Sequence, residues 1–567
     1  MSTPSLASGP DGPHALRPLL DTVLDALDAG ARARGGPLPS GGPDAVAARV
    51  RAAVGDVLPD QGDPNALHTV VRALAEAAAD PADPFCTAHL HCPPLAVATA
   101  ADLAVSALNP SLDSWDQAPG ASELEALVTG ALAREVFGRG VAVRGVFGGE
   151  ASAREAAMRE VFGGEVSSRE GAEAGAVREV ADRGGASARE VSGEAVAPGR
   201  AASADKTAAS ANETAEGAAA SADRPADRTA VAANEPSGET GLRAPRRRIR
   251  PRPPSALITT GGTESNQLAL LLAREAHGAG VRLVHGANAH HSLPRAAWLL
   301  GLAEPVVVPA PAGALDPAAL DEALTELTGP HLVVATVGTT DAGIIDPLPE
   351  IAALCAAHGA RLHVDAAYGG GLLFSGRYRD RLTGLAAADT VTLDLHKFGW
   401  QPVAAGLLAV RDPADLAVLH HHAEYLNADD DTEAGLPDLL GRSLRTSRRP
   451  DVLKIAVTLK TLGRSGLGRL VEQVCDSAHE FAALVHEHPG FELYDRPTLS
   501  TVLFRPAHAT DDAVAAVRRR LLTDGRAVLG RARIDGRLWL KATLLNPHTR
   551  PDDLAALLKL VEGNTPG

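Results

Sequence analysis

The sequence predicts an α/β protein whose large domain has a mainly parallel sheet, preceded by a helical segment and followed by a small α+β domain. Three observations lead to this prediction. Apolar runs of strand length alternate with helical patterns between positions 254 and 412. Hydrophobic residues make up 45% of the 567 residues, which is enough for a sizeable core. A long low-complexity tract interrupts the chain, so its length overstates the number of folded domains.

Residues 1–133 are expected to be helical. Apolar residues recur at helical spacing between positions 15 and 85, as at Leu67, Val70 and Leu74. Two more helices are expected between positions 90 and 132, where the turn-forming residues at 109–110 and 118–120 separate them.

Residues 134–254 are expected to be a disordered insertion. The tract is rich in Ala, Gly, Ser, Glu and Arg, and imperfect copies of REVFG begin at Arg134, Arg144 and Arg159. Their spacing is too irregular for a solenoid, which needs a regular unit. The basic run at 246–250 suits the solvated end of a linker, which is the commoner role of such runs. A contact with an acidic partner or nucleic acid is the alternative.

Residues 255–435 are expected to form the large domain, and residues 436–567 a linking helix and the small domain. A helical pattern at 348–358 is typical of the helices that separate parallel strands. The predicted strands are 332–336, 361–364, 390–393 and 406–410 in the large domain, and 501–504 and 538–545 in the small one.

Composition argues against several classes of protein. A net charge of -16 and a pI near 5.7 argue against nucleic acid as a partner. The sequence shows neither a secretory leader nor an apolar window of about 18 residues, so we expect neither export nor a membrane span. The four cysteines form no CxxC pair, which is typical of a reducing, cytoplasmic setting.

The motif TTGGTESN at 259–266 suits a phosphate site. Its two glycines let the backbone turn tightly, and its hydroxyl and N–H groups would lie at the N-terminus of the apolar helix that follows. An ordinary turn with a helix cap fits the same residues equally well.

Asp365 and Ala367 follow a predicted strand in the motif HVDAAY at 363–368. The carboxyl ends of parallel strands face the crevice where α/β sheets bind ligands. Ala367 would leave room for a flat ring beside the carboxylate. A carboxylate that only stabilises a turn is the alternative.

Lys397 follows another predicted strand, next to His396. A lysine in a partly desolvated crevice can lose its proton and bond covalently to a carbonyl group, although a solvated lysine is the commoner case. The chain has only six lysines, and Lys397 alone lies at a strand exit beside a histidine. The helical patterns around three others are expected to place them in solvent: Lys454, Lys460 and Lys559.

His290 follows an apolar strand and could stack on a flat cofactor or move a proton near neutral pH. A structural histidine at a strand end is the alternative. A zinc site built from His290, His291, His363 and His396 is another, although no metal-type spacing recurs. We therefore expect no metal.

These four signals occur in an order that suits pyridoxal 5′-phosphate (PLP). A helix N-terminus would hold the phosphate, Asp365 would keep the pyridine nitrogen protonated, and Lys397 would bind the cofactor covalently. Each signal alone is weak, but together they indicate a PLP site.

The sequence resembles the group II PLP-dependent amino-acid decarboxylases, which have the fold type I of aspartate aminotransferase. Within this family it is most similar to bacterial L-2,4-diaminobutyrate decarboxylases and to the lysine and ornithine decarboxylases of siderophore pathways. The segments that carry the resemblance are 89–93, 112–117, 363–368, 394–402, 424–427 and 540–547.

The resemblance implies roles for individual residues. Lys397 would bond to PLP, Asp365 would pair with the pyridine nitrogen, and His290 would stack on the ring. Further cofactor contacts are implied for Gly262, Thr263, Thr340, Ala367 and His396.

Tyr425 would lie on a mobile loop and protonate the substrate carbon after carbon dioxide leaves. Family members are homodimers with sites at the interface, so this loop could serve the partner's site. The chain departs from the family pattern at Pro94, His291 and Pro450, which bears on the identity of the substrate.

The expected activity is decarboxylation of a basic L-amino acid, such as L-2,4-diaminobutyrate, lysine or ornithine. An aromatic amino-acid or glutamate decarboxylase, or another PLP enzyme of the same fold, is the first alternative. A non-catalytic scaffold, with the insertion as its working part, is the second. The reaction products distinguish the expected activity from the first alternative, and failure to bind PLP would favour the scaffold.

Overall fold

The computed structural model describes residues 4–138 and 253–565, which belong to one compact unit. The tract predicted to be an insertion lies outside the described residues, except at its two ends. In the described part of the chain, no helix is long and apolar enough to cross a membrane.

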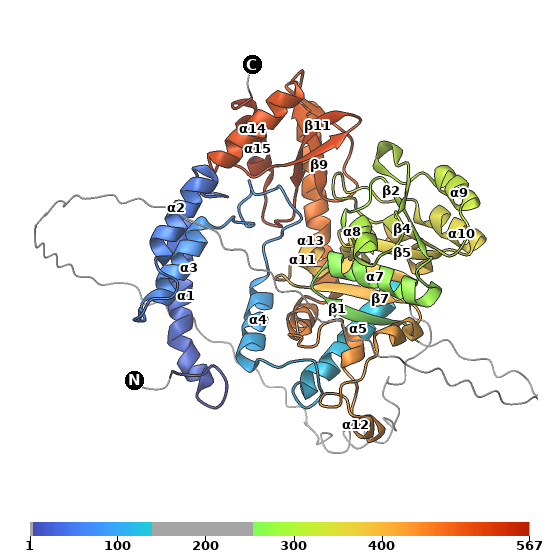
Figure 1. Ribbon diagram of the computed structural model, residues 1–567. Coiled ribbons are helices and arrows are strands. Elements are labelled where there is room, and N and C mark those ends of the chain that lie inside the picture. Colours follow the sequence, from blue (N-terminus) through green and yellow to red (C-terminus); the bar gives the residue numbers. More distant parts are fainter. Residues whose placement is uncertain (1–3, 139–252, 566–567) are drawn as a thin grey trace, which may run out of the picture. The chain divides into compact units, whose positions relative to one another are not determined.

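A seven-stranded sheet forms the centre of the large domain, with the strand order β1-β7-β6-β5-β4-β2-β3 (Figure 1). Strand β7 runs antiparallel to both of its neighbours, and the other pairs are parallel. The mainly parallel sheet predicted from the sequence is confirmed. The strands are β1 (Ser255–Thr259), β2 (Arg282–Gly286), β3 (Val306–Val308), β4 (His331–Thr336), β5 (Arg361–Ala366), β6 (Thr390–Asp394) and β7 (Gly406–Val410).

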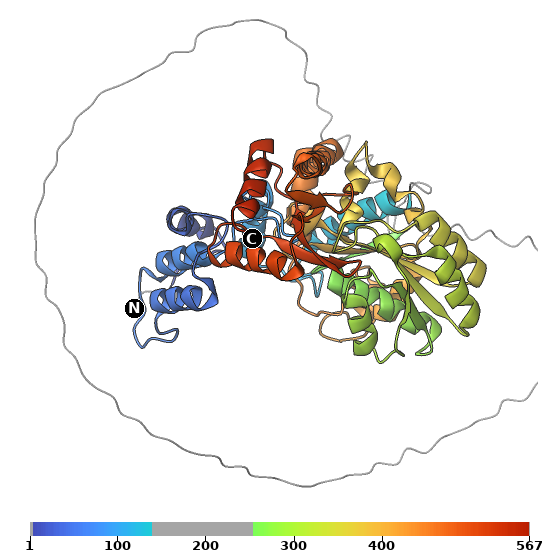
Figure 2. The ribbon, with the colours of Figure 1, turned by 90° about the horizontal axis from the view of Figure 1, so that it is seen from above.

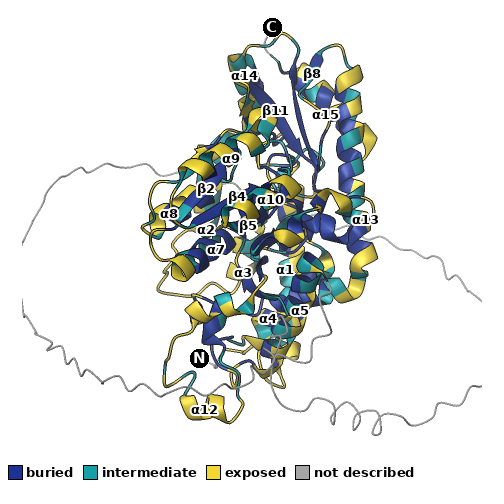
Figure 3. Cartoon of the chain, turned by 90° about the vertical axis from the view of Figure 1, so that its right-hand side faces the viewer, coloured by how far each residue is buried: buried dark blue, intermediate teal, exposed yellow. Residues whose placement is uncertain are grey.

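The central strands are buried on both faces, which explains their continuous apolar sequences. Every residue of β4, β6 and β7 is buried, although successive side chains point to opposite faces (Figure 3). The flanking helices are α7 (Gly262–His277), α8 (Ser292–Leu299), α9 (Pro317–Glu326) and α10 (Leu348–His358).

The N-terminal part is helical, as predicted. It contains α1 (Gly12–Arg34), α2 (Gly42–Val54), α3 (Ala66–Ala77), α4 (Ala96–Leu108) and α5 (Pro119–Phe137). The connection between α1 and α2 meets the small domain, where Gly41 N donates to Thr523 O at 2.8 Å (Figure 2).

Helix α5 continues into the tract predicted to be an insertion. It ends at Phe137, before Gly138, whose φ of 85° leaves the helical conformation. Val136 in the last turn is buried in the main core, and Glu135 pairs with Arg379, with 3.1 Å between Oε2 and Nη1. The first copy of the REVFG repeat is therefore partly folded as a helix end.

The small domain is a four-stranded antiparallel sheet with the order β10-β11-β9-β8. Its own core contains the edge-to-face pair Phe481 and Phe504, whose ring centroids are 5.2 Å apart. Its elements are α13 (Val452–Glu487), β8 (Phe491–Leu493), β9 (Thr501–Pro506), α14 (Asp511–Thr523), β10 (Gly530–Ile534), β11 (Arg537–Thr543) and α15 (Pro551–Glu562).

Lys454 lies in α13 but does not face solvent, so that prediction was wrong. Its side chain is fully buried, and Nζ lies 3.1 Å from Asp451 Oδ1 and 3.3 Å from Asp102 Oδ1. A buried ammonium is tolerated here because two carboxylates compensate its charge.

Candidate active site

A cavity of about 320 Å³ lies at the carboxyl ends of the central strands. Thr336, Asp365 and Asp394, the residues at or next to the ends of β4, β5 and β6, line it. This is the edge at which open α/β sheets bind ligands.

The glycine turn between β1 and α7 forms one wall of the cavity. Gly262 begins α7, whose first N–H groups have no side-chain cap. A Cβ at Gly262 would lie 3.0 Å from Ala367 Cβ and 3.1 Å from Asp394 Oδ2, so only glycine leaves this space open. With Thr263 beside it, the turn suits an anionic group such as a phosphate.

Asp365 lies next to the last residue of β5, and its carboxylate accepts hydrogen bonds from two donors. Oδ1 accepts from Ala367 N at 3.1 Å, and Oδ2 accepts from Asn266 Nδ2 at 2.9 Å. The residue is 5% exposed and lines the cavity together with Ala367. A buried carboxylate held in this way can pair with a protonated ring nitrogen.

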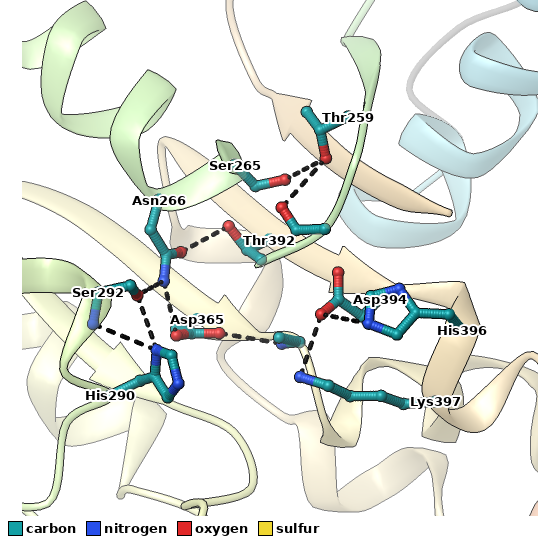
Figure 4. A network of polar contacts seen from close by, with 12 residues as sticks. Thr259, Ser265, Asn266, His290, Ser292, Asp365, Thr392, Asp394, His396 and Lys397 are labelled. Carbon is teal, nitrogen blue, oxygen red and sulfur yellow. Dashed lines mark hydrogen bonds and ion pairs between the residues drawn. The ribbon is translucent and has the colours of Figure 1, made fainter. Parts of the chain in front are cut away.

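Lys397 lies on the short helix α11 (Leu395–Phe398), directly after β6. Its Nζ is 3.0 Å from Asp394 Oδ2, and His396 Nε2 is 3.5 Å from the same oxygen. Burial lowers the pKa of His396, and Asp394 opposes this effect. The lysine is therefore held in the cavity by a carboxylate that the sequence analysis did not identify (Figure 4).

His290 faces the same cavity from the loop between β2 and α8. Its Nδ1 lies 2.8 Å from Ser292 Oγ. Burial lowers the pKa of His290, while Asp365 acts in the opposite direction. Thr340 also lines the cavity, and its carbonyl oxygen accepts from Lys541 Nζ at 2.9 Å.

Tyr425 is the one predicted catalytic residue that the structure does not bring to the cavity. Its side chain is 82% exposed, in a turn before α12 (Asp429–Glu433). The other predicted residues line the cavity together: Gly262, Thr263, His290, Thr340, Asp365, Ala367, His396 and Lys397.

The histidines considered for a zinc site make other contacts. His363 is buried between Thr390 Oγ1 and Asn266 Oδ1, at 2.9 and 3.0 Å. Within residues 4–138 and 253–565, no three His, Cys, Asp or Glu side chains are grouped as metal ligands would be.

Asn266 and Asp394 are the site residues that sequence reasoning missed. Asn266 belongs to the glycine-turn motif, and Asp394 precedes Lys397 by three positions. Their positions within recognised motifs were the available signal. The partners of Asn266 are distant in sequence, so only the fold shows them, whereas Asp394 pairs with its sequence neighbours His396 and Lys397.

The residues around this cavity fit PLP. The glycine turn leaves space for a phosphate, Lys397 supplies an amine, and Asp365 supplies a carboxylate for the pyridine nitrogen. Two buried polar atoms beside the turn, Asp394 Oδ1 and His396 Nδ1, have no hydrogen-bond partner among the described residues.

Comparison with known proteins also indicates a PLP-binding protein. The pyridoxal-dependent decarboxylase conserved domain matches residues 254–507. The L-2,4-diaminobutyrate decarboxylase of Rhizobium meliloti is 44% identical over 328 residues, which are 55% of this chain and 66% of that protein. The enzyme of the same name from Acinetobacter baumannii is 32% identical over 346 residues, which are 54% of this chain and 68% of that protein. The matches thus span about two thirds of each relative.

Solved structures show the same fold. The glutamate decarboxylase domain of a Vibrio parahaemolyticus diaminobutyrate-pyruvate transaminase and L-2,4-diaminobutyrate decarboxylase covers 99% of this chain and 97% of its own. Its TM-score is 0.69 at 24% identity. The Oryza sativa TDC with PLP and tryptamine has a TM-score of 0.71 at 20% identity and covers 99% of both chains.

Proposed function

Because the chain belongs to the pyridoxal-dependent decarboxylase family, we propose that it removes the carboxyl group of a basic L-amino acid, with L-2,4-diaminobutyrate as the first candidate. One observation carries this proposal. The cavity brings Lys397, Asp365 and the glycine turn together at one sheet edge. Lysine and ornithine are the next candidates.

PLP, when bound, supplies an electron-accepting ring for the electron pair that the departing carboxylate leaves behind. In this proposal the Lys397 amine would hold the cofactor covalently. Asp365 keeps a proton at the ring nitrogen, and the glycine turn with His396 holds the phosphate. His290, Ala367 and Thr340 would contact the ring, and Thr263 would contribute to the phosphate site.

The charge of the cavity supports a cationic substrate. Three described carboxylates line it, from Glu264, Asp365 and Asp394, of which Glu264 pairs with Arg445 and Asp394 with Lys397. Once the Lys397 amine is bonded to the cofactor, the Asp394 carboxylate is left without its ammonium partner. An acidic side chain would be repelled, and an ammonium group attracted.

We also propose that the protein works as a homodimer. The N-terminal helices α1 and α3 leave an apolar surface exposed, to which Leu24 at 63% and Leu74 at 65% contribute. Surfaces of this kind are typical of interfaces. A dimer would also give the exposed Tyr425 a place to act, in the cavity of the partner subunit.

A cytoplasmic location is the last part of the proposal. All four cysteines are free thiols, and three of them are buried. This usage suits a reducing compartment.

A panel of amino acids tests the proposed reaction. The protein is incubated with PLP and, separately, L-2,4-diaminobutyrate, lysine, ornithine, aspartate, glutamate and tryptophan, and amines and carbon dioxide are measured by mass spectrometry. The proposal expects equal amounts of diamine and carbon dioxide from a basic substrate. Decarboxylation of only an acidic or aromatic substrate would overturn the substrate assignment, and a keto-acid product would overturn the reaction class.

A further inference from the structure

Asn266 lies at the centre of a buried hydrogen-bond network that links Asp365 and, through Ser292, His290 (Figure 4). The residue is 1% exposed, in the first turns of α7. Its Nδ2 donates to Asp365 Oδ2 at 2.9 Å and to Ser292 Oγ at 3.0 Å. Its Oδ1 accepts from Thr392 Oγ1 at 2.9 Å and lies 3.0 Å from His363 Nε2. All of its polar atoms therefore have partners.

The carboxylate of Asp365 fixes the orientation of this amide. A carboxylate only accepts hydrogen bonds, so the Asn266 atom that faces it must be the nitrogen. The amide oxygen then faces His363, which must donate from Nε2 and accept at Nδ1 from the Thr390 hydroxyl. Complete burial lowers the pKa of His363, which agrees with a neutral ring in this tautomer.

Ser292 links the orientation of the Asn266 amide to the tautomer of His290. Because Ser292 Oγ accepts from Asn266, its own hydrogen is free to donate to His290 Nδ1, 2.8 Å away. Ser292 N donates to the same nitrogen at 3.3 Å. His290 Nδ1 is thus an acceptor, and the proton of the neutral ring lies on Nε2.

We propose that Asn266 is a positioning residue that orients the Asp365 carboxylate and, through Ser292, sets the tautomer of His290. The amide also lies between Asp365 and His363 and bonds to both side chains. This inference rests on the proposed function, because Asp365 and His290 matter as the residues that contact PLP.

The isosteric variant Asn266→Asp tests the proposal, because it keeps the shape and removes the two N–H donors. Two carboxylates in contact would share one proton, which weakens the charge of Asp365. The Ser292 hydroxyl would turn toward the new acceptor and away from His290. We expect the affinity of the apoprotein for PLP to fall about 10-fold to 100-fold, the range known for residues that orient metal ligands. The pH at which the visible spectrum of bound PLP changes should also shift.

Two further variants separate positioning from general damage. Asn288→Asp is the matched control, because Asn288 Nδ2 also donates to a buried carboxylate, Asp346 Oδ1 at 2.8 Å, but outside the cavity. We expect it to lower stability and leave PLP affinity and the spectrum unchanged. Thr392→Val removes the donor to Asn266 Oδ1 without altering a cavity residue, and should weaken PLP binding about 3-fold to 10-fold.

The proposal is overturned if Asn266→Asp and Thr392→Val bind PLP like the wild type with an unchanged spectral pH dependence. It is also overturned if Asn288→Asp weakens PLP binding to the same degree as Asn266→Asp. A wild-type protein that does not bind PLP at all would instead overturn the proposed function.

Discussion

Gly262 shows how one missing side chain shapes the site. An added Cβ would come within 3.0 Å of Ala367 Cβ and 3.1 Å of Asp394 Oδ2. We predict that Gly262→Ala lowers PLP affinity, because the new methyl group would press on Ala367 and Asp394 in the cavity wall, at a cost of about 1–3 kcal/mol of packing strain. Titration of the apoprotein with PLP measures this. Gly280→Ala is the control, since nothing lies within 4 Å of its Cβ position. Equal PLP affinity in both variants would show that the turn does not hold the phosphate.

Sequence reasoning found the site residues whose signal is local. Lys397 and Asp365 were identified because each follows a strand within a short motif. Asn266 was missed because its role depends on Asp365, 99 positions away. The burial of Lys454 was missed for the same reason, since one of its two carboxylates, Asp102, comes from α4.

Four of the seven strands of the large domain were predicted close to their observed bounds, because each is an apolar run specified by its own residues. The apolar run at 406–410 corresponds to β7 without any shift, and the helical pattern at 348–358 to α10. The direction of β7 was not predictable. A strand that is buried on both faces has the same sequence pattern whether it runs parallel or antiparallel to its neighbours.

A buried ion pair joins helix α5 to the segment that precedes α13. Arg448 Nη1 donates to both carboxylate oxygens of Glu125, at 2.9 and 3.1 Å, and the residues are 3% and 5% exposed. We predict that Glu125→Gln lowers the free energy of unfolding by about 3–5 kcal/mol, because it leaves the arginine charge buried without a counter-charge. Urea denaturation of the apoprotein measures the loss.

The exposed pair of Asp28 and Arg32 on α1 provides the control for that measurement. Its side chains are 61% and 70% exposed, so Asp28→Asn should change the free energy of unfolding by less than about 1 kcal/mol. Comparable losses from Glu125→Gln and Asp28→Asn would contradict the structural role of the buried pair.

Across the whole protein, histidines whose pKa values are lowered by burial should make the free energy of unfolding depend on pH. Burial lowers the pKa values of His290, His363 and His396 in the folded protein below that of an unfolded histidine. The unfolded chain therefore takes up protons first as the pH falls through about 6.5, and stability falls with it.

We predict that the free energy of unfolding of the apoprotein decreases between about pH 6.5 and pH 5, and that His363→Gln makes this decrease smaller. Urea denaturation at a series of pH values measures both. A wild-type curve that is flat or rises toward acidic pH, or one with the same slope in His363→Gln, would contradict the prediction.

Mixing subunits tests whether Tyr425 acts across a dimer interface. Lys397→Ala and Tyr425→Phe should each lower activity strongly when tested alone. If Tyr425 serves the partner's cavity, a mixed dimer has one complete site, and about a quarter of the wild-type activity returns when equal amounts exchange freely. Exchange is verified by mass spectrometry of the intact dimers. Exchanged dimers without recovered activity would rule out a role in the partner's site.

The most direct test of the proposed active site is to locate the lysine that binds PLP. The protein is loaded with PLP, the bond is fixed by borohydride reduction, and the digested peptides are mapped by mass spectrometry. We predict that the modified residue is Lys397, with no modification in Lys397→Ala. Modification at Lys541 or Lys454 instead, or no modification of the loaded wild-type protein, would contradict it.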